Sequence, residues 1–79
     1  MKYHIGQKVK IRNAIWKKNN PPTGTIIGTF KLNTNKFDSE ARLEVSVRDS
    51  HLTPYGYDVL WDKNNTYNSW SEIELEAAQ

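Results

Sequence analysis

The sequence predicts an all-β domain, a small five-stranded barrel with one short helical turn near its C-terminus. Five short segments are rich in β-branched or aromatic residues, or alternate apolar with polar ones, and turn-forming residues separate them. No segment carries a long helical period, and several short strands with turns between them are typical of small barrels. The 79 residues are expected to form one domain, 1–79, in which large aromatic side chains supply much of the core.

The first strand is expected at residues 7–12, where apolar and cationic residues alternate. Val9 and Ile11 would face the core, since successive side chains of a strand point to opposite faces. The other face carries three cations at a spacing of about 6.6–7 Å along the strand, namely Lys8, Lys10 and Arg12. This spacing is close to that of successive phosphates along one nucleic-acid strand.

Residues 23–32 form the expected second strand, because β-branched residues are dense there. Gly24 and Gly28 are interpreted as bends or as close approaches of the backbone. The preceding residues, 13–22, break the strand pattern and end in two prolines, which donate no hydrogen bond to a sheet. We therefore expect a loop between the first two strands.

A third strand is expected between two loops in the middle of the chain. Residues 33–41 are interpreted as a polar loop that carries an exposed Phe37. Residues 42–48 alternate again, which predicts a strand with three inward side chains, Leu43, Val45 and Val47. A second loop at about 49–56 contains a proline and a glycine and carries Tyr55.

The C-terminal third predicts two more strands and a helical turn. Residues 57–61 and 66–70 are the fourth and fifth strands, joined by a turn at 62–65 in which asparagine adopts a positive φ. Ser71 and Glu74 match a capping box, which predicts a single helical turn. The same tail also alternates as a strand would, and we expect the turn to bury one of two apolar residues, Ile73 or Leu75.

Four sequence segments resemble SH3-like small barrels. "IGQKVKI" and "TGTIIGTF" are similar to the strand–loop–strand of KOW-type domains, and "YDVLWD" and "SWSEIELE" are similar to Tudor-like and chromo-barrel domains. The resemblance implies a barrel that acts as a binding module. Two features depart from it: the turn after Asp62 lacks a glycine, and residues 33–56 are longer than a minimal barrel needs. No family-specific binding motif is intact.

Charge is distributed unevenly along the chain. Residues 1–36 hold eight lysines and arginines and no acid, whereas residues 37–79 hold three against nine acids. Two interpretations remain open. The halves could neutralise each other across adjacent strands, or they could leave a basic face that attracts a polyanion.

The favoured function is nucleic-acid binding without catalysis. The basic first strand and the following loop would contact phosphates, and an aromatic residue of that loop would stack on a base. The predicted site consists of Lys8, Lys10, Arg12, Trp16, Lys17 and Lys18. The structural alternative is that the lysines discourage pairing of an edge strand and that Trp16 packs on the barrel.

Three other functions compete with this one. A protein-interaction module, of phage origin and directed at a host protein, is the alternative, and head-to-tail self-association is a third option beside the expected monomer. An aromatic cage for methylated side chains is compatible with five residues of the last two strands, although core packing explains them as well: Tyr57, Val59, Trp61, Tyr67 and Trp70. The lysine- and asparagine-rich composition suits a bacterial or phage genome.

Several functional classes are not expected. The acids Asp58, Asp62, Glu72, Glu74 and Glu76 lack the spacing of a metal-binding loop. Asp49-Ser50-His51 contains the residue types of a catalytic triad, but three adjacent residues cannot align as one. We therefore expect no enzyme, no metal and no cofactor. The lack of cysteine, of a long apolar run and of a signal peptide predicts a soluble cytoplasmic protein without a membrane partner.

Overall fold

The computed structural model describes residues 1–32 and 39–78, which form a mostly β fold. Five antiparallel strands make one sheet in the order β4-β3-β2-β1-β5, and the described residues contain a single α-helix. In chain order the elements are β1 (Lys8–Ile11), β2 (Thr23–Lys31), α1 (Glu40–Asp49), β3 (Tyr55–Trp61), β4 (Tyr67–Ser71), the 3-10 helix η1 (Glu72–Glu74) and β5 (Leu75–Ala77). The predicted all-β class is confirmed.

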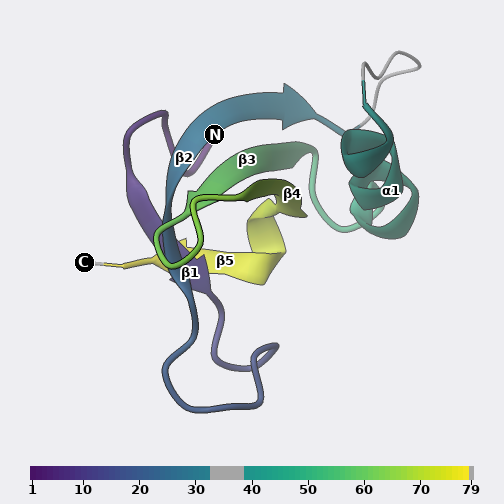
Figure 1. Cartoon of the computed structure of the whole chain (residues 1–79). Coiled ribbons are helices and arrows are strands. Elements are labelled where there is room, and N and C mark those ends of the chain that lie inside the picture. The colour runs from purple at the N-terminus through teal and green to yellow at the C-terminus, as the bar shows by residue number, and fades with distance from the viewer. Residues whose placement is uncertain (33–38, 79) are drawn as a thin grey trace.

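The sheet is bent but not closed. β2 curves through the middle of the sheet and pairs with β1 at its start and with β3 along nearly its whole length (Figure 1). Gly24 permits this packing, because a Cβ there would lie 2.6 Å from the Leu60 carbonyl oxygen and 2.7 Å from Val59 Cγ1. β4 and β5 remain the two edges of the sheet, so the predicted barrel closure is not confirmed.

The main core cluster joins side chains of β1, β2, β3 and β5. Val9 and Ile11 of β1 are buried, as the alternation of the first strand predicts. Leu75 of β5 is fully buried beside them, and the Tyr3 and Tyr57 rings pack edge to face at 5.4 Å. Burial of apolar area in this cluster supplies the main driving force for the fold.

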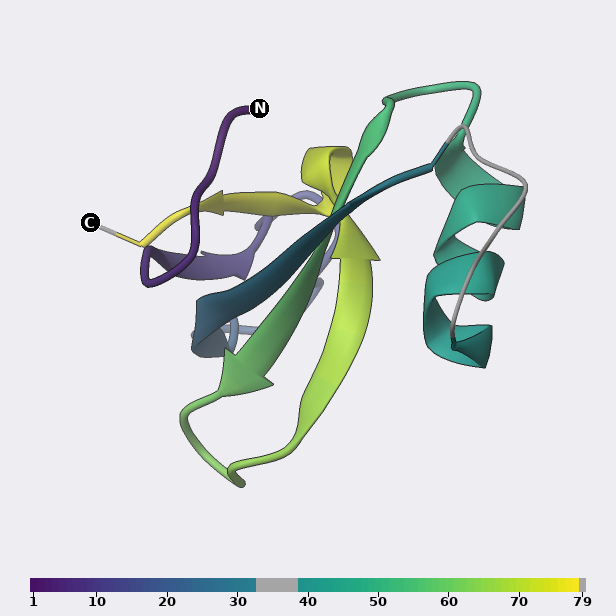
Figure 2. The same ribbon diagram turned by 90° about the horizontal axis from the view of Figure 1, so that it is seen from above.

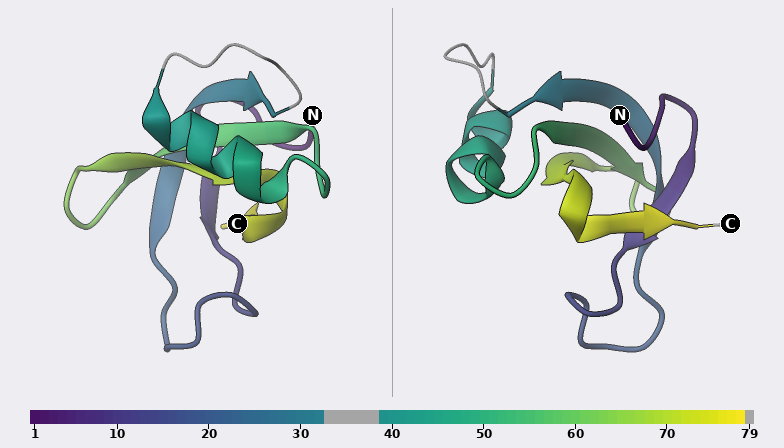
Figure 3. Two further views of the ribbon diagram at one scale, coloured as in Figure 1. Left: turned by 90° about the vertical axis from the view of Figure 1, so that its right-hand side faces the viewer. Right: turned by 180° about the vertical axis from the view of Figure 1, so that it is seen from behind.

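The C-terminal tail combines both interpretations of its sequence. Ser71 precedes η1, and Glu74 Oε1 accepts a hydrogen bond from the Ser71 backbone N–H at 3.1 Å, as a capping box requires. Leu75 is the apolar residue that the turn buries, and it then begins β5, which pairs with β1 (Figure 3, right). The predicted helical turn is confirmed, and the last strand follows it.

The prediction of a strand at residues 42–48 is wrong, because this segment lies in α1. Of the three side chains expected to point inward, Val45 is 2% exposed, but Leu43 and Val47 are 47% and 76% exposed. Ser39 begins the helix by accepting the Arg42 N–H on its hydroxyl at 3.2 Å. The helix therefore begins inside the polar loop expected at 33–41.

The inward face of α1 is mostly polar, so the sequence shows no apolar pattern with the period of a helix. Besides Val45, this face carries Arg42, Ser46 and Asp49, spaced as one side of a helix. Ser46 Oγ donates to the Leu32 carbonyl oxygen at 2.6 Å, so the polar face is satisfied by hydrogen bonds. An apolar pattern with period two was the more visible signal.

Two smaller expectations concern aromatic residues of the middle segment. Tyr55 does not lie on an exposed loop, since it is the first residue of β3 and packs, half-buried, against the core. Phe37, with the rest of residues 33–38, lies outside the described residues. Within the described part of the chain, no helix combines the length and apolar character needed to cross a membrane.

The helix lies at one end of the sheet, and the β1–β2 loop and the β3–β4 turn lie at the other. Figures 1 and 2 show α1 beside the last residues of β2, while the β1–β2 loop and the β3–β4 turn extend away from it. The left view of Figure 3 shows α1 crossing in front of the strands, with the β1–β2 loop below. The helix therefore does not cover the surface between the β1–β2 loop and the β3–β4 turn.

Candidate functional site

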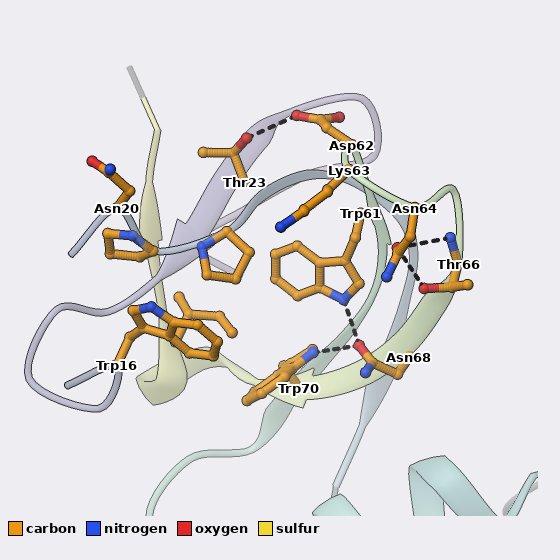
Figure 4. Close-up of a pocket in the computed structure, with 13 residues that line it drawn as sticks. Trp16, Asn20, Thr23, Trp61, Asp62, Lys63, Asn64, Thr66, Asn68 and Trp70 are labelled. Atoms are coloured by element: carbon orange, nitrogen blue, oxygen red, sulfur yellow. Dashed lines mark hydrogen bonds between the residues drawn. The ribbon is translucent and has the colours of Figure 1, made fainter. Parts of the chain in front are cut away.

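A groove lies between the β1–β2 loop and the β3–β4 hairpin. Its volume is about 610 Å³, and all three tryptophans of the chain line it (Figure 4). Trp16 comes from the loop, Trp61 from the end of β3 and Trp70 from β4. Segments far apart in the sequence thus build one aromatic surface, which we call the tryptophan groove.

Asn68 holds two of the indoles in place. Its Oδ1 accepts hydrogen bonds from Trp61 Nε1 at 2.7 Å and from Trp70 Nε1 at 2.5 Å. An indole nitrogen can only donate, so the amide must present its oxygen to both rings. The rings stand at 87° with their centroids 6.0 Å apart, an edge-to-face contact. Trp61 and Trp70 are therefore held to each other by one amide oxygen and by their own ring contact.

Trp16 forms the opposite wall and is held less tightly. The Ile15 and Trp16 backbone N–H groups each donate to the Arg12 carbonyl oxygen at 2.9 Å, which folds the loop back after β1. The Trp16 ring is half-buried against the core, but its Nε1 is buried and has no hydrogen-bond partner among the described residues. Lys18 Nζ lies 5.8 Å from the centre of this ring, within the range of a cation–π contact.

A second, polar pocket of about 520 Å³ lies beside the groove, and we call it the basic pocket. Lys10, Lys17 and Lys18 supply its cations. It shares three lining residues with the tryptophan groove, namely Trp16, Asn20 and Pro21. Asn20 adopts a positive φ of 57°, which asparagine tolerates better than most residues and which turns the chain ahead of the two prolines. The loop therefore separates an aromatic recess from a cationic one.

The outward cations of β1 differ in how far they are engaged. Lys8 Nζ forms an ion pair with Asp62 Oδ1 at 2.7 Å. This hydrogen bond and a second one from the Thr23 hydroxyl lower the pKa of the Asp62 carboxyl. Lys10 lies opposite Glu76 in the β1–β5 ladder, but the structure records no ion pair between them. The first strand is therefore not a stripe of fully free cations.

Arg12 is directed toward the protein rather than toward solvent. One of its terminal nitrogens lies 3.5 Å from the Leu75 carbonyl oxygen, while its Nε is buried and has no partner among residues 1–32 and 39–78. Of the six predicted site residues, the structure therefore gathers Lys10, Lys17 and Lys18 around Trp16. Lys8 and Arg12 are drawn toward groups of the same molecule.

Three carboxylates of the C-terminal half form ion pairs with arginines of the same half, namely Asp49, Asp58 and Glu74. Arg42 pairs with Asp58 at 2.5 Å, and Arg48 forms ion pairs with both Asp49 and Glu74. Among the described cations of residues 1–31, Lys8 is the one that forms an ion pair with the acidic half. Asp62 pairs with Lys8, and Glu72 and Glu76 accept the Lys2 and Asn13 backbone N–H groups, so the two halves are neutralised in part where they meet.

The tryptophan groove as a unit was not predicted from the sequence. The sequence is compatible with Trp61 and Trp70 as core residues or as a cage with Tyr57 and Tyr67, but Tyr57 is fully buried and Tyr67 does not line the groove. Asn68 lies two residues before Trp70, and only its contact with both indoles distinguishes it. Lys63, on the turn, points toward the groove in Figure 4 and carries no signal of its own in the sequence.

Comparisons with known proteins identify no relative: no family model, no curated protein and no solved structure matches the chain. Within the described ranges, no three acidic or histidine side chains gather as a metal ion would require. Function must therefore be inferred from the groove and from the charges around it.

Proposed function

We propose that this protein is a non-catalytic nucleic-acid-binding module, in which the basic pocket holds phosphates and Trp16 stacks on a base. One observation carries the proposal: three lysines surround a half-exposed indole, and none of the three forms an ion pair with a described carboxylate. Phosphate contacts of this kind supply most of the affinity of sequence-independent binding. Stacking on an aromatic ring tolerates every base.

The six residues predicted to bind nucleic acid do not contribute equally in this proposal. Lys10, Lys17 and Lys18 contact phosphates directly. Lys8 and Arg12 would first have to leave Asp62 and the Leu75 carbonyl oxygen, so they contribute less. The exposed Lys8–Asp62 pair is weak and could be exchanged, but the Asp62 carboxylate would then lie unpaired beside a phosphate of like charge, which reduces the net gain.

The alternative is a protein-interaction module that takes a proline-rich peptide. Tryptophan and proline side chains line the groove, and aromatic-lined grooves dock extended proline-rich segments. The charges around the groove favour the polyanion, because Lys63 lines it and Lys18 Nζ lies 5.8 Å from the centre of the Trp16 ring, while Asp62 is already paired with Lys8. The same cations disfavour a cage for a methylated cationic side chain, since like charges would repel it.

Neutralising the basic pocket tests the proposal. The double variant Lys17→Gln/Lys18→Gln is titrated against a fluorescent oligonucleotide at low salt. We expect affinity to fall about tenfold or more, since two cations no longer neutralise phosphates. Lys31→Gln is the matched control, because Lys31 is also exposed but lies at the other end of β2. Equal affinities of all three proteins, or no binding by the unmodified chain, would refute the proposal.

A further inference from the structure

We infer that the ligand is single-stranded, and that unpaired bases enter the tryptophan groove while their phosphates occupy the basic pocket. The inference rests on the proposed function and goes further, because it specifies the strand state and assigns the bases a site. Contacts to phosphates alone would not distinguish a single strand from a duplex. The arrangement of the three indoles does distinguish them.

The groove offers ring faces in a fixed arrangement. Trp16 and Trp70 are half-buried, so part of each ring remains accessible, while Trp61 is 7% exposed and forms the floor. Asn68 holds the floor and one wall at right angles through its two indole hydrogen bonds. A flat ring that enters from solvent can stack without reorganising the site, which lowers the entropic cost of binding.

The aromatic and cationic recesses adjoin each other on either side of the same loop residues. They share Trp16, Asn20 and Pro21, so the two surfaces meet along the β1–β2 loop. A nucleotide has the same pattern, a flat apolar base joined to an anionic phosphate. Lys63 points toward the groove from the opposite side (Figure 4), where it can meet the next phosphate along the strand.

A duplex cannot use this site. Its bases are stacked and paired inside the helix, so the recessed indoles could reach none of them unless a base were unpaired and flipped out of the stack. The basic pocket alone would even favour a duplex, which carries about one charge per 1.7 Å of its axis and so a denser array of phosphates than a single strand. Tighter binding of a single strand than of a duplex would therefore indicate contacts with bases, because charge alone favours the duplex.

The experiment compares three oligonucleotides of equal length at one salt concentration. They are a strand of about twelve thymidines, a hairpin duplex, and a strand of the same length that carries abasic sites, within the roughly 4–16 nucleotides covered by other small β domains that bind single strands. We expect the thymidine strand to bind most tightly and to quench tryptophan fluorescence. We expect the abasic strand, which keeps every phosphate, to bind about 5- to 150-fold more weakly for each base that no longer stacks on an indole.

Two substitutions of Trp16 locate the effect. Trp16→Phe keeps an aromatic face and removes no hydrogen bond, because Trp16 Nε1 has no partner among the described residues. Trp16→Leu keeps apolar bulk but lacks a ring. We expect the leucine variant to bind the thymidine strand about 5- to 150-fold more weakly and the phenylalanine variant to stay close to the unmodified chain. Should the leucine variant fail to fold, the abasic strand still tests base stacking in the unmodified protein.

The outcomes separate the two proposals. Equal binding of the abasic and thymidine strands, or tighter binding of the duplex, would overturn the single-strand inference while nucleic-acid binding stands. If none of the three oligonucleotides binds at low salt, both are overturned. A proline-rich peptide that binds the groove and excludes the thymidine strand would overturn the assignment of the groove to bases.

Discussion

The salt dependence of binding should reveal how many cations contact the ligand. For a single strand, the logarithm of the affinity falls with the logarithm of salt concentration by about 0.7 per phosphate neutralised. The structure leaves three lysines in the basic pocket without an ion pair among the described residues, and Lys63 beside the groove can add a fourth. We therefore expect a slope of about −2 to −3, and affinity about 20- to 50-fold lower at 200 mM than at 50 mM salt.

The same measurement tests the fate of the β1 cations. If Lys8 and Arg12 also contacted phosphates, the slope would approach −4 and affinity would fall about 300-fold over the same range. The assay is fluorescence anisotropy with a labelled single strand at several salt concentrations. We expect Lys17→Gln to reduce the slope by about 0.7 and Lys8→Gln to leave it unchanged, because Lys8 is already paired with Asp62.

Two results would refute this reasoning. A slope weaker than about −1 would mean that fewer than two phosphates are neutralised, so the basic pocket would not hold the backbone. A reduced slope in Lys8→Gln would mean that Lys8 exchanges Asp62 for phosphate on binding. In that case the ion pair would not limit the site as the geometry implies.

Three further predictions concern the fold. Val45→Ala should cost about 1–3 kcal/mol in urea unfolding and Val47→Ala less than about 0.5, because only Val45 is buried; equal costs would favour a strand. The hydrogen bond with Lys8 lowers the pKa of Asp62, so this pair stabilises the fold above pH ~4 and its contribution is lost as pH falls. A carboxyl NMR titration would check this, with Asp62→Asn identifying the Asp62 signal by its absence; an unshifted Asp62 pKa would contradict it. Burial raises the pKa of Tyr57, so stability should fall once pH exceeds about 10 and tyrosinate absorbance should report late ionisation; ionisation at the ordinary pKa would contradict this.

Strands with a simple alternation were predictable from the sequence. Val9 and Ile11 alternate with cations and are buried in β1, and residues 57–61 lie within β3. The capping box at Ser71 was equally local, since its two partners lie three residues apart. In each case the signal and the structure involve neighbouring residues of one segment.

The helix was not predictable from its apolar pattern. Arg42, Ser46 and Asp49 face the sheet together with Val45, and each polar member is paired, so burial does not require apolar character there. The partner of Asp49, the Ser71 hydroxyl at 2.5 Å, lies 22 residues away. Only the tertiary structure reveals why a polar side of α1 is buried.

Only the part of the site that lies on one segment was predictable from the sequence. The cations and Trp16 are neighbours in sequence, and their order indicated a basic loop with an aromatic residue. The second wall of the groove comes from β3 and β4, and the ion pair that engages Lys8 joins residues 54 positions apart. Contacts over such distances depend on the register of the sheet, which alternation alone does not determine.

The different roles of arginine and lysine explain how the basic loop keeps its charge. A guanidinium presents several donors in one plane and can therefore pair with more than one carboxylate. Arg48 forms such ion pairs with Asp49 and Glu74. Glu74 in turn caps η1, so this carboxylate serves the structure of the acidic half. Lys17 and Lys18, each with a hydrated ammonium on a flexible stem, remain on the β1–β2 loop without an ion pair among the described residues, while the nearby Glu76 accepts the Asn13 backbone N–H. A folded chain of net charge +2 can therefore present a locally cationic surface next to its three tryptophans.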